Sequence, residues 1–141
     1  AFREFLKPRY AKLFAEWKRL NPGVKIAFHS DGYCYPIVAD LAEIGLDILN
    51  PIQPRSMDPA RVKREFGSNL TLWGTVDIQQ VLPFGKPEDV VEEVKLRLRT
   101  AGRSGGLILA PAHNIQPEVP VENILAFYDA AKQYGRYPLE A

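Results

Sequence analysis

Short apolar runs that alternate with helical patterns are the feature that most constrains the fold of this chain. Four such runs lie at residues 24–28, 46–49, 70–73 and 106–110, and each is nearly continuously apolar, which is typical of strands in a covered parallel sheet. A helical pattern follows every run. Because strands that alternate with helices are joined by right-handed crossovers, the sequence predicts an α/β fold with four parallel strands in sequential order.

The helical patterns begin and end at recognisable signals. A leading helix is predicted over residues 2–20, with a bend at Pro8. Further helices start at or directly after a proline, which suits the first helical turn. They are predicted over residues 36–44, 59–66, 87–101 and 121–134, with a short helical turn over 78–82.

Four strand–helix units after one leading helix amount to half of an eight-stranded (β/α)8 barrel of the TIM type. A small open α/β sheet is the alternative. The chain opens without a methionine and already inside a helical pattern, so we expect residues 1–141 to be one half-barrel fragment of a longer protein. Only one glycine, Gly32, follows the first strand, which disfavours a dinucleotide-binding fold.

Composition and charge limit the classes of partner that the chain is expected to bind. The net charge is +1 and 46% of the residues are hydrophobic, a balance that predicts a globular domain without strong attraction to nucleic acid or to an anionic membrane. No apolar run is long enough to span a bilayer, and the first residues do not form a signal peptide. Cys34 is the single cysteine, so no internal disulfide forms and a cytoplasmic location is expected.

Polar side chains gather where the predicted strands end. The chain has only two histidines, His29 and His113, and each follows an apolar run, at the edge where parallel α/β folds build their sites. Other polar residues at these ends are Asp31, Asn50, Gln53, Asp77 and Gln116. Two imidazoles and one carboxylate suit a divalent ion, so His29, Asp31 and His113 are a candidate metal set. The alternative is that such residues cap helices and hold loops in place.

Several stretches resemble the uroporphyrinogen decarboxylase superfamily, which contains the decarboxylases of haem biosynthesis and related cobalamin-dependent methyltransferases. They are Phe28–Gly32, Leu72–Asp77, Gly106–His113 and Pro117–Ile124. Their order and spacing cover essentially the whole chain. The resemblance implies the C-terminal half of the family's (β/α)8 barrel.

The resemblance to the decarboxylases implies roles for particular residues. His113 matches the histidine that lines their tetrapyrrole cleft, and Asp31-Gly32 matches an Asp-Gly pair in the corresponding loop. Asp77 stands where the family has Asp-Pro, with Ile78 in place of the proline. Together with His29, these residues are the candidate substrate-binding set. The catalytic aspartate and the substrate-binding arginine of the decarboxylases belong to the N-terminal half.

The resemblance to the methyltransferases implies a metal site in the same two loops. In those enzymes a His-x-Cys pair and a later cysteine bind zinc. Here His29 matches the first ligand, Asp31 replaces the first cysteine and His113 replaces the second. The chain therefore offers an imidazole–carboxylate–imidazole set where the methyltransferases use two thiolates.

The leading hypothesis is the C-terminal part of a uroporphyrinogen decarboxylase-like enzyme that binds a carboxylated tetrapyrrole or related ligand at the strand carboxyl ends. Decarboxylation needs no cofactor. One alternative is a metal-dependent corrinoid methyltransferase, with zinc as the cofactor, and another is a non-catalytic binding or assembly module. The expected partners are the ligand, the missing N-terminal half of the barrel and a second copy in a homo-oligomer. The fragment alone is expected to be inactive.

Overall fold

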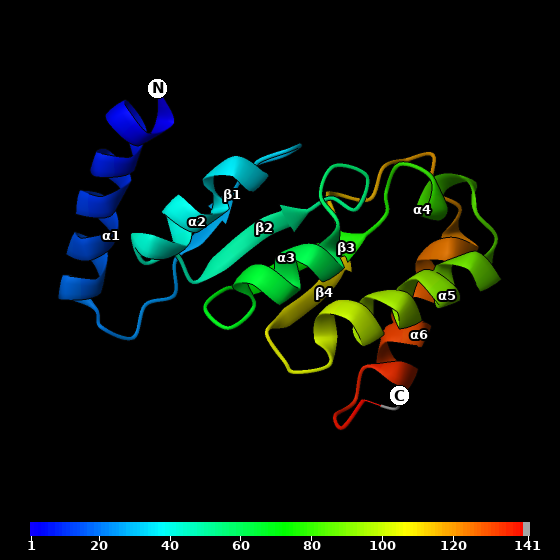
Figure 1. Ribbon diagram of the computed structural model, residues 1–141. Coiled ribbons are helices and arrows are strands. Elements are labelled where there is room, and N and C mark those ends of the chain that lie inside the picture. Colours follow the sequence, from blue (N-terminus) through cyan, green and yellow to red (C-terminus); the bar gives the residue numbers. More distant parts are fainter. Residues whose placement is uncertain (140–141) are drawn as a thin grey trace.

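The computed structural model describes residues 1–139 and contains one sheet of four parallel strands (Figure 1). The strands pair in the order β1-β2-β3-β4, which confirms the predicted sequential topology. Their bounds are Ala27–His29 for β1, Ile48–Ile52 for β2, Thr71–Val76 for β3 and Leu107–Pro111 for β4.

Helices follow the strands as expected for βα units. Figure 1 shows α2, α3 and α5 in front of the sheet, and α1 beyond the β1 edge. The α-helices are α1 (Lys7–Leu20), α2 (Tyr35–Glu43), α3 (Pro59–Phe66), α4 (Val81–Phe84), α5 (Pro87–Arg97) and α6 (Val121–Tyr134), and two π-helical turns are η1 (Phe2–Leu6) and η2 (Leu98–Gly102). Within residues 1–139, no helix combines the length and the apolarity needed to cross a membrane.

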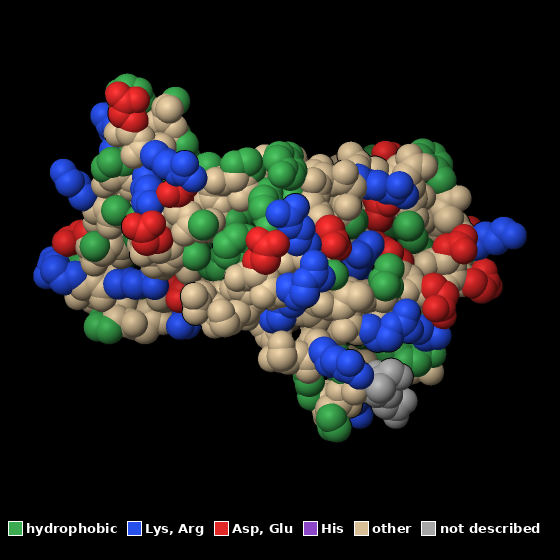
Figure 2. Space-filling view, in the orientation of Figure 1, with side chains coloured by type: hydrophobic (Ala, Val, Ile, Leu, Met, Phe, Trp, Pro, Cys, Tyr) green, Lys and Arg blue, Asp and Glu red, His purple; other side chains and the backbone are tan. Residues whose placement is uncertain are grey.

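Two apolar clusters hold the helices on the sheet. The first joins α2 and α3 to the middle strands through Leu41, Leu49, Val62 and Leu72, all fully buried. The second lies under α5 and α6 and contains, among others, Val76, Val90, Val94 and Phe127. Figure 2 shows Lys and Arg mixed with Asp and Glu on the helix-covered side. The two histidines, both within the described part of the chain, are not seen in that view.

The strands end later than the sequence predicts. β2 continues to Ile52 rather than 49, and β3 continues to Val76 rather than 73, because Ile52 pairs with Gly74 and Val76 pairs with Pro111. The first strand begins at Ala27 instead of residue 24. Hydrogen-bonded pairing with the neighbouring strand therefore decides where these strands end. This pairing cannot be seen in the sequence.

The helix boundaries differ less. α3 and α6 match the predicted ranges, and α2 begins one residue early. The predicted break near Pro8 is the junction between the π-helical η1 and α1, with Pro8 in the first turn of α1. The predicted helix over 87–101 is α5 followed by η2, and the predicted turn over 78–82 is replaced by α4.

Ion pairs attach the leading helix to α2. The Asp40 carboxylate accepts hydrogen bonds from Lys7 Nζ at 2.7 Å and from Arg3 Nε at 2.8 Å. Lys7 and Arg3 hold the pKa of the Asp40 carboxyl below its usual range. At the other end of α1, Lys18 Nζ donates to the Gly45 carbonyl at 2.6 Å and pairs with Asp47. Polar contacts thus fix the position of α1 alongside the buried Phe14.

The sheet face opposite α2 and α3 is partly exposed to solvent. Leu49 and Leu72 are buried in the cluster with α2 and α3, so their neighbours Asn50 and Trp73 point to the other face because side chains alternate along a strand. Trp73 pairs with Ile108, and these two apolar side chains are 38% and 40% exposed. Exposed apolar surface of this kind is typical of an interface.

We predict that the isolated chain associates through this open face. Ile108→Lys places a charge on the face and should shift the protein toward monomer. Leu96→Lys is the matched control, because Leu96 lies on α5 and is 38% exposed. Light scattering over a range of concentrations measures both variants. A wild-type chain that stays monomeric at all concentrations contradicts the prediction.

Candidate functional site

A pocket of about 450 Å³ lies at the carboxyl ends of the strands. Parallel strands bring these ends to one edge of the sheet, which is where sites form in α/β folds. The lining residues come from the ends of the strands, from the loop after β4 and from α6. They are His29, Asn50, Trp73, Ala110, Pro111, Ala112, His113, Asn114, Ile115 and Tyr128.

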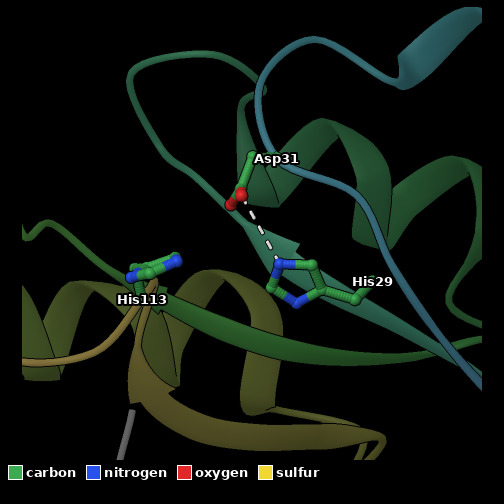
Figure 3. Close-up of side chains that lie close together, drawn as sticks. All are labelled: His29, Asp31 and His113. Atoms are coloured by element: carbon green, nitrogen blue, oxygen red, sulfur yellow. Dashed lines mark ion pairs between the residues drawn. The ribbon is translucent and has the colours of Figure 1, made fainter.

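His29, Asp31 and His113 converge beside this pocket (Figure 3). His29 is the last residue of β1, Asp31 follows in the next loop, and His113 lies two residues after β4. One ligand atom from each residue lies within 4.8 Å of the other two. All three side chains are exposed, so a ligand from solvent can reach them. The sequence-predicted metal set is therefore one cluster in space.

The convergence joins residues from opposite edges of the sheet. β1 and β4 are the two edge strands, and in a flat sheet with strands ~4.8 Å apart they would be separated by ~14 Å. The ring centroids of His29 and His113 are only 6.2 Å apart. This short separation fits a sheet that curves as in a segment of a barrel wall, with the two side chains bridging the remaining distance.

Neighbouring polar groups hold the His29 ring and its loop. His29 Nδ1 lies 2.7 Å from Asn50 Oδ1, and His29 Nε2 lies 3.4 Å from Asp31 Oδ2. The backbone N–H of Gly32 donates to Gln53 Oε1 at 2.6 Å. Gly32 has a φ of 75°, a conformation that favours glycine. Asn50 in the middle of β2 and Gln53 directly after it thus hold His29 and the loop that carries Asp31.

The distances suit one divalent ion. Two ligands at ~2.0–2.2 Å from a tetrahedral ion are ~3.3–3.6 Å apart, and the 3.4 Å between His29 Nε2 and Asp31 Oδ2 falls in this range. The His113 ligand atom lies within 4.8 Å of the other two, and its side chain is exposed. The three residues can therefore hold a metal and leave a further coordination position open.

Asp77 lies apart from the cluster. Its carboxylate is buried and accepts hydrogen bonds from Arg55 Nε at 2.7 Å and from the backbone N–H of Gln79 at 2.7 Å. The backbone N–H of Asp77 donates to Glu93 Oε1 at 3.2 Å. Asp77 thus fixes the turn before α4, and the structure does not bring it together with the histidines.

Cys34 is buried and lies outside the site. Its Sγ is 3.8 Å from Met57 Sδ in the core, and burial raises the pKa of the Cys34 thiol. A buried thiol with a raised pKa is a poor nucleophile and metal ligand. The geometry therefore gives no support to Cys34 as a metal ligand at this site.

Trp73 and Tyr128 line the pocket, although the sequence did not indicate either residue as part of a site. Trp73 is the β3 neighbour of Asn50 on the open face, so strand alternation could have indicated it. Tyr128 lies on α6 next to the buried Phe127, with ring centroids 4.9 Å apart. No local pattern distinguishes Tyr128 from an ordinary exposed helix residue. A larger hollow of about 570 Å³ between α5, η2 and the C-terminal segment contains none of the predicted site residues.

Comparisons with known proteins agree with this fold. Residues 1–134 match the family model described as uroporphyrinogen decarboxylase (URO-D). The methylcobamide:CoM methyltransferase MtaA of Methanosarcina barkeri is 28% identical over 133 residues, covering 94% of this chain and 36% of that protein. A uroporphyrinogen decarboxylase of Trichodesmium erythraeum is 26% identical over 132 residues, again covering 94% of this chain and 36% of that protein.

A solved structure gives the same relationship. The methyltransferase from Methanosarcina mazei superposes with a TM-score of 0.73 at 27% identity, covering 96% of this chain and 37% of that one. The chain thus spans little more than a third of the length of these relatives. Four parallel strands with this coverage fit part of a TIM-type barrel.

We predict that Asp77 acts on stability rather than on ligand binding. Asp77→Ala should lower the free energy of unfolding by about 1–3 kcal/mol, because a buried acceptor of several hydrogen bonds is lost. Asp89→Ala is a milder comparison, since Asp89 accepts only an exposed cap bond from Lys86 N, and its loss should cost about 0.5–1 kcal/mol. Urea denaturation measures both. Unchanged stability with lost ligand binding in Asp77→Ala would restore its predicted substrate-binding role.

We predict the opposite behaviour for His113. His113→Ala should leave the thermal midpoint within a few degrees, because removing an exposed side chain leaves no core cavity. It should weaken binding of zinc at least about tenfold, equivalent to ~1.4 kcal/mol. Calorimetric melting and zinc titration measure the two effects. A large loss of stability with unchanged zinc affinity would identify His113 as a purely structural residue.

Proposed function

The chain belongs to the uroporphyrinogen decarboxylase (URO-D) family, and from this premise we propose that it carries the metal-binding part of a methyltransferase of that family. His29, Asp31 and His113 bind one divalent ion, with zinc as the leading candidate. The observation that supports this proposal is the convergence of their three ligand atoms to within 4.8 Å. Relatives named as methyltransferases, two by sequence and one by structure, favour the same hypothesis.

The donor set suits the proposed chemistry. Two imidazoles and a carboxylate from the protein, with one position left open, are typical of catalytic rather than structural zinc. Zinc at such a site lowers the pKa of a coordinated acceptor group and so prepares it for methyl transfer. The chain's own residues hold the ion, and Asn50 orients His29 through its 2.7 Å contact. The ligand would lie in the adjoining pocket of about 450 Å³.

The second candidate is a uroporphyrinogen decarboxylase-like enzyme that binds a carboxylated tetrapyrrole. Decarboxylase relatives match the same stretch of the chain with the same coverage, which favours this candidate. His29 and His113, when protonated, would each form a charged hydrogen bond with a substrate carboxylate. No cofactor would be needed in that case. A non-catalytic binding or assembly module is the third candidate.

The proposal includes the partners and the location of the protein. The open face of the sheet, with Trp73 and Ile108 exposed, would be covered by the rest of the barrel or by a second copy in a homo-oligomer. The single, buried, unpaired Cys34 agrees with a cytoplasmic location. The fragment alone would lack the second wall of the active site.

Metal analysis tests the proposal. Protein purified without chelator should contain about one zinc per chain, because the three ligands act on one ion. Asp31→Ala should lower the zinc content severalfold. Asp129→Ala is the matched control, since Asp129 is an exposed aspartate on α6 away from the cluster. Elemental analysis that finds less than about a tenth of an equivalent of any transition metal removes the metal proposal.

Ligand titration then separates the candidates. A corrinoid should bind if the methyltransferase proposal is right, and a porphyrinogen analogue should bind if the decarboxylase candidate is right. If the chain is a non-catalytic binding or assembly module, neither the corrinoid nor the porphyrinogen analogue should bind. Absorbance spectra of both pigments provide the measurement.

A further inference from the structure

We infer that Asn50 is a positioning residue that selects the Nδ1–H tautomer of His29 and leaves Nε2 free to bind the ion. The inference rests on the proposed metal function. Asn50 on β2 would thus control the tautomer of His29, a proposed metal ligand on β1.

The strand pairing places Asn50 where it can act. His29 and Asn50 are partners in the parallel register of β1 and β2. The Asn50 carbonyl accepts a hydrogen bond from Ser30 N at 2.8 Å, so the backbone after His29 is held by the same residue. Leu49 and Pro51 on either side are buried, whereas the Asn50 side chain lines the pocket. The position of the Asn50 amide is therefore fixed by the sheet.

The contact determines which ring nitrogen carries the proton. An amide oxygen can only accept a hydrogen bond, so the 2.7 Å contact between Asn50 Oδ1 and His29 Nδ1 requires a proton on Nδ1. In a neutral imidazole, Nε2 then has the free lone pair. Metal-binding histidines commonly donate their other ring N–H to a carbonyl or carboxylate in this way.

The other side of the ring places a carboxylate next to Nε2. His29 Nε2 lies 3.4 Å from Asp31 Oδ2 (Figure 3). With the proton on Nδ1, both of these atoms offer lone pairs to the space between them. Such a pair is stabilised by a cation that both atoms bind, or by a second proton on the ring. Asn50 therefore directs the His29 lone pair toward the side where Asp31 and His113 lie.

Two substitutions of Asn50 separate positioning from packing. Asn50→Asp keeps an oxygen acceptor for Nδ1–H, and Asn50→Leu keeps a similar shape without an acceptor. We expect zinc affinity to fall about 10–100-fold in Asn50→Leu and to stay within about threefold of wild type in Asn50→Asp. If Asn50→Leu does not fold, Asn50→Ala replaces it. Equal affinity in the leucine or alanine variant and wild type overturns the inference.

The tautomer itself is measured without metal. Nitrogen-15 NMR of the metal-free chain, under mildly alkaline conditions where histidines are neutral, should show His29 protonated on Nδ1 in wild type. Asn50→Leu should shift His29 toward the Nε2–H tautomer and leave His113 unchanged, which is the internal control. An unprotonated Nδ1 in wild type overturns the inference. Because this measurement needs no zinc, failure of the metal proposal and failure of the Asn50 assignment are distinguishable.

Discussion

The parallel pairing of β1 with β2 is the interaction on which the candidate site depends. It places His29 opposite Asn50, and it sets the loop that carries Asp31 beside the end of β2. A shift of one residue in this register would turn His29 to the helix-covered face, because strand side chains alternate. Curvature of the sheet then brings His113, from the opposite edge, to a ring separation of 6.2 Å. Register and curvature together make one site from residues 84 positions apart in the sequence.

The backbone at the end of β3 is closely packed and conformationally strained. A Cβ on Gly74 would lie 3.3 Å from the Ala112 backbone and 3.4 Å from the Ile52 backbone, so both neighbouring strands approach closely there. Thr75 has a φ of 87°, which costs a non-glycine residue on the order of 1–3 kcal/mol. Its Oγ1 is buried and has no hydrogen-bond partner among the described residues. The sheet therefore stores strain next to the strand ends that build the site.

Sequence reasoning succeeded where a local signal exists. Asp58 and Pro59 at the start of α3 and Pro120 before α6 mark helix ends that the structure reproduces. The same reasoning brought both histidines and Asp31 to one edge, because parallel topology alone requires it. It placed the strand ends too early, because Pro51 and Gly74 suggest loops although the strands pair through them. Asp77 shares the topological position of a site residue, and only its three-dimensional partners reveal its role in the turn before α4.

The exposure of the three proposed metal ligands indicates how a bound ion and the fold would be related. His29, Asp31 and His113 are all exposed, and both apolar clusters lie against the helices rather than beneath these residues. Empty ligands in contact with water carry little desolvation penalty, so the chain can fold without an ion. A structural zinc site, by contrast, is closed and supplies folding free energy. The exposed cluster would therefore suit the proposed ion that acts on a ligand better than a structural zinc.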